Sequence, residues 1–173
     1  VFQTIGDFGR AAELLRRSVG AADWAAGTPS PGFRIESRAF LARTLSALGE
    51  FAEGRRHGEE ALRLATLAGR GLTPIVVHGC LGPLYLAQGD LEHAIQVLEQ
   101  GLALCRASCD RNDLRLMLAS LGSAAALQGR LAEGRALLEE STGESSRTGA
   151  RQQPNWVAWL SEVCRLAGHG EDA

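Results

Sequence analysis

Apolar residues recur along this chain at the spacing of amphipathic helices, and the helices come in pairs. After Gly89 the apolar positions lie three or four residues apart and form one stripe along a helix. This stripe consists of Leu91, Ala94, Ile95, Leu98, Leu102 and Cys105. Prolines mark several helix starts, because the first helical position does not need an N–H donor. The pattern predicts helices over 7–25, 31–48, 50–68, 74–88, 90–108, 113–128, 130–147 and 154–167.

A glycine follows the first helix of each pair at intervals of about 40 residues, and such a period is typical of repeat proteins. These glycines are Gly6, Gly49, Gly89, Gly129 and Gly168. The residues around them are also alike, as 48–51, 88–91 and 128–131 show. The period predicts an all-α chain with one repeat array over 1–173. Its parts are a partial repeat over 1–27, repeats over 31–68, 74–108 and 113–147, and a terminal helix over 154–167.

The residues around Gly89 resemble the consensus of the tetratricopeptide repeat. The matching positions are Leu81, Gly82, Tyr85, Gly89, Asp90, Leu91, Ala94 and Leu98. The resemblance implies a right-handed α-solenoid of antiparallel helix pairs, with about eight helices. A period near 40 exceeds the usual 34, which places extra residues between the pairs.

Two segments, 84–105 and 156–162, are similar to the C-terminal repeat regions of large bacterial signalling proteins. In those proteins a nucleotide cyclase domain and an NTPase module precede the repeats, and related arrays follow an NTPase in some transcriptional activators. The resemblance implies a regulatory module cut from a longer polypeptide. Neither activity is implied for this chain, which has no cyclase domain and no Gly-x-x-x-x-Gly-Lys-Ser/Thr phosphate-binding loop.

In the architecture that the resemblance implies, the first helix of each pair lines a concave groove. Positions 13, 10, 6 and 3 before the marker glycines then face the groove, and thirteen of these residues are candidates for binding a partner. The candidates are Glu36, Ala39, Arg43, Val76, Gly79, Pro83, Leu86, Leu116, Ala119, Ser123, Asn155, Glu162 and Arg165. This surface is apolar and small in its middle, which favours a protein or peptide segment, or another domain of the parent chain.

Two interpretations of the groove stay open. A scaffold predicts an open groove with distributed apolar contacts, and the apolar middle of the surface favours it. An effector sensor predicts a bounded pocket with convergent polar groups, such as Arg43 and Glu36. The groove could also hold the chain's own helices or a second copy of the chain, and self-association is possible for that reason.

Composition narrows the function further. The net charge is -2, with 45% hydrophobic and 22% charged residues, so the chain lacks the basic character of nucleic-acid-binding domains. No apolar run is long enough to span a membrane. The four histidines are scattered over different units, so we expect no metal site, no cofactor and no catalytic set. The chain is therefore expected not to be an enzyme.

The remaining composition bears on the source of the chain. Four cysteines without a disulfide framework predict reduced thiols and a cytoplasmic location. Every basic residue is arginine, which indicates GC-rich coding and a bacterial origin. The chain opens within a repeat, so we expect it to be a fragment of a larger protein.

Overall fold

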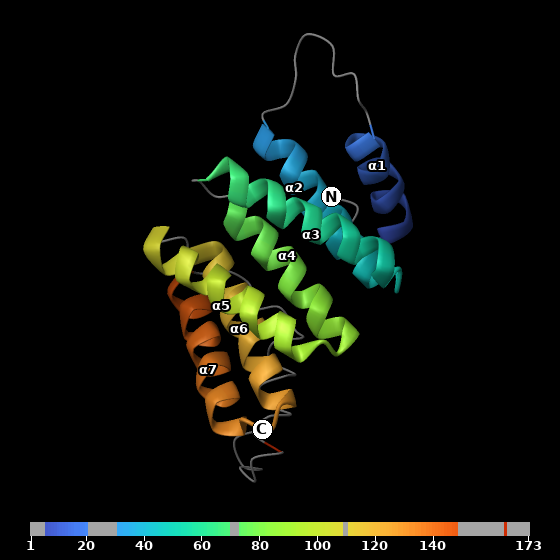
Figure 1. Ribbon diagram of the computed structural model, residues 1–173. Helices are drawn as coiled ribbons and strands as arrows, with labels where there is room; N and C mark the ends of the chain where they lie inside the picture. The colour runs from blue at the N-terminus through green and yellow to red at the C-terminus, as the bar shows by residue number, and fades with distance from the viewer. Residues whose placement is uncertain (1–5, 21–30, 70–72, 109–110, 149–164, 166–173) are drawn as a thin grey trace. The chain divides into compact units, whose positions relative to one another are not determined.

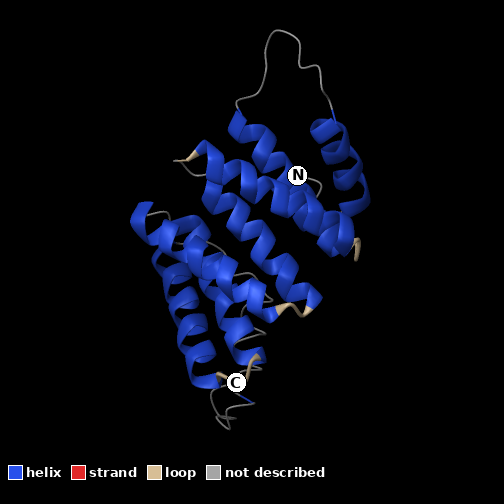
Figure 2. Ribbon diagram, viewed as in Figure 1, coloured by secondary structure: helices blue, strands red, loops and turns tan. Residues whose placement is uncertain are grey.

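The computed structural model describes residues 6–20, 31–69, 73–108, 111–148 and 165, and the elements in this part of the chain are α-helices (Figure 2). The chain divides into two compact units, Val1–Gly89 and Asp90–Ala173. The first unit holds α1 (Phe8–Gly20), α2 (Pro31–Ala47), α3 (Phe51–Ala68) and α4 (Thr73–Gln88) (Figure 1). The second holds α5 (Leu91–Ser108), α6 (Arg111–Leu127) and α7 (Leu131–Thr148).

The all-α class and the helix pairs predicted from the sequence are confirmed. The bounds of α2 to α7 agree with the predicted ranges to within two residues. The predicted helix over 154–167 lies outside the described residues except at Arg165, as do residues 21–25 of the first predicted helix. The division into one repeat array stays a prediction.

The turns inside the helix pairs depend on glycine. Gly49, after α2, has φ 77°, and Gly129, after α6, has φ 84°. At both turns the glycine N–H donates to the carbonyl three residues before it, at 3.1 and 2.9 Å, and the next N–H donates to the carbonyl five residues before it, at 2.9 Å. This is the Schellman pattern of helix termination, in which a left-handed residue satisfies the last carbonyls. It turns the chain back on itself within three residues, so the two helices of a pair pack antiparallel.

The first unit is held together by small residues on α3. Gly54 and Gly58 are buried, and α3 packs on both α2 and α4. A Cβ atom at Gly58 would lie 2.6 Å from Leu81 Cδ1 of α4 and 3.4 Å from Ala42 Cβ of α2. Close packing at these glycines offsets the helix-propensity cost of about 1 kcal/mol that each incurs relative to alanine.

The second unit repeats this arrangement between α6 and α7. A Cβ atom at Gly134 would lie 2.7 Å from the carbonyl oxygen of Gly122 and 2.9 Å from Ala126 Cβ. Leu138 fills the space beside this contact and is fully buried. The two backbones therefore approach each other at a place where no side chain fits between them.

The N-terminal helix α1 is joined to the rest of the first unit by an apolar contact and by charge. Ala12 packs with Leu41 and Leu45 of α2. The guanidinium of Arg16 donates to the carboxylate of Glu53 at 3.0 and 2.8 Å, and also to the carboxylate of Glu50. One arginine of α1 therefore holds two carboxylates at the start of α3.

Candidate functional site

The first candidate site is a face of the first unit that α2 and α4 build together. Glu36 and Arg43 lie on α2, and Val76, Pro83 and Leu86 lie on α4; all five are partly exposed. We call these five residues the α2–α4 face. Helices α2 and α4 pack against each other, although α3 separates them in the sequence.

The apolar part of the α2–α4 face lies on α4. Val76, Pro83 and Leu86 are spaced seven and three residues apart, which places them on one side of the helix. Helix α4 is continuous through Pro83, and the residues next to Pro83, Gly82 and Leu84, are buried. Of the other two candidates in this unit, Ala39 is fully buried in the core with Val77 and Cys80, and Gly79 is also buried.

The two charged groups of this face are spread out. The Glu36 carboxylate accepts a hydrogen bond of 2.9 Å from the hydroxyl of Thr73, at the start of α4. The Arg43 guanidinium stacks over the ring of Phe40, 5.3 Å from its centroid. Arg43 follows Glu36 by seven positions on α2, which corresponds to about 10 Å along the axis. Each charged group has its own local contact.

The remaining candidates lie in the second unit or outside the described residues. On α6, Leu116 is partly exposed, and Ala119 and Ser123 are buried. The Ser123 hydroxyl donates to the carbonyl of Ala119 at 3.0 Å. Asn155 and Glu162 are outside the described residues, and Arg165 is described only as an exposed helical residue.

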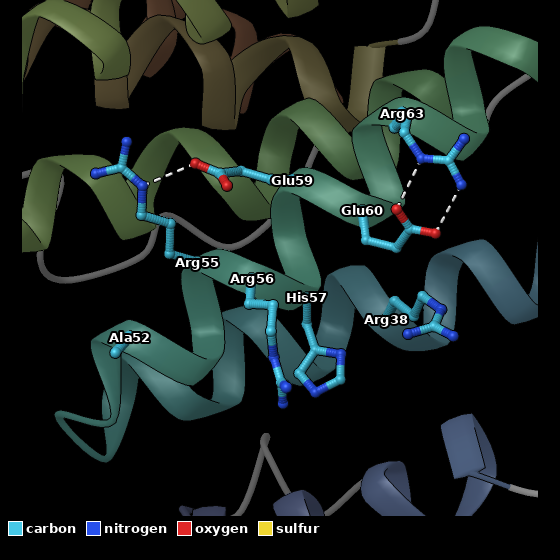
Figure 3. Close-up of a pocket in the computed structure, with 8 residues that line it drawn as sticks. All are labelled: Arg38, Ala52, Arg55, Arg56, His57, Glu59, Glu60 and Arg63. Atoms are coloured by element: carbon cyan, nitrogen blue, oxygen red, sulfur yellow. Dashed lines mark hydrogen bonds and ion pairs between the residues drawn. The ribbon is translucent and has the colours of Figure 1, made fainter.

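A second candidate site, a recess of about 700 Å³ on α2 and α3, contains none of the predicted groove residues. Figure 3 shows eight residues that line it, with His57 between Arg56 and Arg38. We call these three residues and the space beside them the basic recess. The sequence carries a signal for it in the run Arg55, Arg56, His57, but the contribution of Arg38 from α2 needs the folded chain.

Neighbouring carboxylates around the basic recess are already bound by other arginines. Glu59 accepts from Arg55 at 2.7 Å, and Glu60 accepts two hydrogen bonds of 2.8 Å from Arg63. Glu53, whose carboxylate lies 3.6 Å from His57 Nε2, is held by Arg16. The nearby acidic groups therefore satisfy other partners.

Burial and the neighbouring charges both affect the pKa of His57. Burial lowers the pKa of His57, and the positive charges of Arg56 and Arg38 lower it further, against the opposing effect of Glu53. The hydrogen bond from Arg16 lowers the pKa of Glu53 below its ordinary value. At neutral pH His57 is thus a neutral imidazole between two guanidinium groups.

The described residues offer no metal site: no group of three or more His, Cys, Asp and Glu side chains among them could hold a metal ion. Cys80 and Cys105 are both buried. Within the same described part, no helix is long and apolar enough to cross a membrane.

Comparison with known proteins agrees with this architecture. Two family models, both described as tetratricopeptide repeat, match residues 35–107 and 118–140. The chain is similar in fold to two crystal structures of TPR-like repeats from Podosopora anserina. These nearly identical repeats come from a protein assigned as a kinesin light chain, and one of the two structures is of a point variant. Both are 23% identical to this chain and cover 99% of it and 84% of their own length, with TM-scores of 0.72 and 0.71. Comparison with curated proteins gave no match.

Proposed function

Because this chain is built from tetratricopeptide repeats, which generally mediate protein–protein interaction, we propose that it is the regulatory interaction module of a multidomain bacterial signalling protein. The module binds a protein segment, or a sister domain of its parent chain, on the α2–α4 face. It acts in the cytoplasm, and the lack of a disulfide framework in the sequence is compatible with that location.

The observation that carries this proposal is the form of the α2–α4 face. Its apolar residues, Val76, Pro83 and Leu86, are distributed along α4 and remain partly exposed. An extended apolar surface of this kind suits a helix or strand of a partner, which makes contacts over several turns.

An effector-sensing function is the alternative, and the charged pair Glu36 and Arg43 is the feature that favours it. A small ligand needs polar groups that converge on it. About 10 Å along α2 separates these two residues, and the Glu36 carboxylate already accepts a hydrogen bond from Thr73. The spacing supports the scaffold over the sensor.

Photo-crosslinking in source cells tests the scaffold. A photoreactive amino acid at Leu86 should give a covalent adduct with a protein, or an internal crosslink in the parent chain. The matched control is Leu67 on α3, which is 73% exposed and lies outside this face. Equal crosslinking from both positions, or none from Leu86, would refute the assignment of this face.

The variant Leu86→Asp completes the test. Because Leu86 is partly exposed, we expect the helicity of the variant to equal that of the wild type. The adduct formed from a probe at Val76 should disappear in this variant.

An immunoblot of the source cells gives the size of the parent chain. A band well above 18.4 kDa directs the search to sister domains, and a band near it directs the search to separate partners.

Native mass spectrometry of the protein purified from its source separates the two functions. The sensor predicts a bound small-molecule mass that Arg43→Ala removes, whereas the scaffold predicts the mass of the bare polypeptide.

A further inference from the structure

The basic recess lies apart from the α2–α4 face. It is formed mainly by α3, with Arg38 contributed by α2. The residues of the α2–α4 face do not line it. An inference about this recess therefore goes beyond the proposed interaction function and does not depend on it.

The charge balance of the recess is positive, although the whole chain carries -2. Four arginines and two glutamates line it, together with His57. Arg55 and Arg63 are neutralised by Glu59 and Glu60. Arg38 and Arg56 act on the carboxylates of Glu60 and Glu53 through charge alone, because those carboxylates are hydrogen-bonded to Arg63 and Arg16.

The three basic side chains, Arg38, Arg56 and His57, lie close to one another. Figure 3 shows Arg56 and His57 side by side on the same side of α3, with Arg38 across from them on α2. Both arginines act electrostatically on His57, which indicates that the three groups share one region. The His57 side chain is 13% exposed, so the recess brings a mostly buried imidazole next to two guanidinium groups.

The nearby carboxylates do not compete for these groups. Glu60 uses both oxygens on Arg63, and Glu53 uses both oxygens on Arg16. An anion that enters the recess therefore meets Arg38 and Arg56 without displacing an existing pair. Guanidinium groups match the oxygens of phosphate in geometry and form short, charge-assisted hydrogen bonds with them.

We propose that Arg38, Arg56 and His57 form a binding site for a phosphate dianion, either free or as a monoester on a protein side chain. The two guanidinium groups donate to the phosphate oxygens, and the imidazole of His57 donates a further hydrogen bond. A volume of about 700 Å³ leaves space beside the phosphate for the group that carries it.

Histidine NMR gives a direct test, because the chain has four histidines. The probes are inorganic phosphate, a tripeptide Ala-phosphoserine-Ala with blocked ends, and the same peptide without phosphate, all at constant ionic strength. We expect the ring signals of His57 to shift and saturate with the first two probes. His93, which is paired with Asp90 in the second unit, is the internal control and should not move.

The two phosphate probes distinguish the sources. Tighter binding of the phosphopeptide identifies a phosphorylated protein segment, and tighter binding of inorganic phosphate identifies a free anion. Either result supports the site. A shift of the His57 signals to the same extent by the unphosphorylated peptide would overturn it.

Variants assign the binding to named groups. Arg38→Gln and Arg56→Gln should each weaken phosphate binding by about tenfold, since each removes a charge-assisted hydrogen bond. The matched control is the double variant Glu60→Gln with Arg63→Gln, which removes a lining ion pair without changing the net charge and should bind as the wild type does. Unchanged affinity in both single variants, with wild-type circular dichroism, would refute the proposal.

The outcome is separable from that of the proposed function. Leu86→Asp alters the α2–α4 face and leaves the recess intact, so it should bind phosphate normally. Arg56→Gln alters the recess and should keep the crosslink formed from Leu86.

Discussion

Replacement of Gly134 by alanine tests whether close backbone contact organises the second unit. In an exposed helix, Gly→Ala adds stability of about 1 kcal/mol through helix propensity. At Gly134 the new Cβ atom would lie 2.7 Å from the carbonyl oxygen of Gly122, 2.9 Å from Ala126 Cβ and 3.0 Å from Ala126 N. Ordinary contacts between carbon atoms lie near 3.5–4.0 Å. Helices α6 and α7 must therefore move apart by a large fraction of an ångström.

The size of the effect follows from what blocks the methyl group. Overpacking costs about 1–3 kcal/mol, and the upper end applies when the obstacle is backbone rather than the end of a side chain. After subtraction of the propensity gain, Gly134→Ala should lower the free energy of unfolding by about 2 kcal/mol. Gly58→Ala should cost less, because its nearest obstacle is the flexible end of Leu81.

The control lies on the same helix. Gly143 is exposed on α7, and a Cβ atom there would have no neighbour within 4 Å. Gly143→Ala should raise the free energy of unfolding by about 1 kcal/mol. Urea denaturation followed by far-UV circular dichroism measures both variants. A Gly134→Ala protein that is as stable as the wild type, alongside a stabilised Gly143→Ala, would show that this contact does not limit the packing.

Three further substitutions test other contacts. Gly89→Val should lower the melting temperature in a calorimetric scan, because φ at this position is 78° and a β-branched residue is strained there; a wild-type melting temperature would contradict the turn geometry. Ser141→Ala should cost about 1 kcal/mol in urea denaturation because its hydroxyl bridges α7 to α6, whereas Ser123→Ala should be close to neutral because its hydroxyl bonds its own helix. The Arg16–Glu53 pair should stabilise the fold at neutral pH, because the pKa of Glu53 is lower in the folded protein than its ordinary value of 4.5. The wild type should therefore lose its stability advantage over Arg16→Gln as the pH falls from 4.5 through the lowered pKa of Glu53. A difference between these two proteins that persists in acid would refute that role.

The helices were predictable from the sequence because their signals are local. Apolar spacing reveals a helix without knowledge of its partners, and the positive φ of Gly49, Gly89 and Gly129 agrees with their predicted place at helix ends. Both inferences depend on residues within one repeat. The burial of Gly54, by contrast, involves Leu84 of the next repeat.

The candidate sites were less predictable because they depend on residues from different helices. The recess joins Arg38 of α2 to Arg56 of α3, and nothing in the sequence shows that these two side chains share a space. The bond from Arg16 to Glu53 likewise crosses from α1 to α3. The pairing of Arg55 with Glu59, four residues away on one helix, is the kind of contact that spacing alone predicts. The role of the groove residues in binding remains a prediction. Four of them are buried in the structure rather than exposed: Ala39, Gly79, Ala119 and Ser123.

The order in which the helices pack has a kinetic consequence. Within each unit, the packed pairs of described helices are neighbours in the chain, except that α2 also packs on α4, its second neighbour. Short sequence separation keeps the entropy cost of loop closure small, and chains with such local contacts fold in microseconds to milliseconds. Either unit can begin to fold around its own tight glycine turn. A nascent chain could therefore acquire structure in the first unit during synthesis, before the second has been translated.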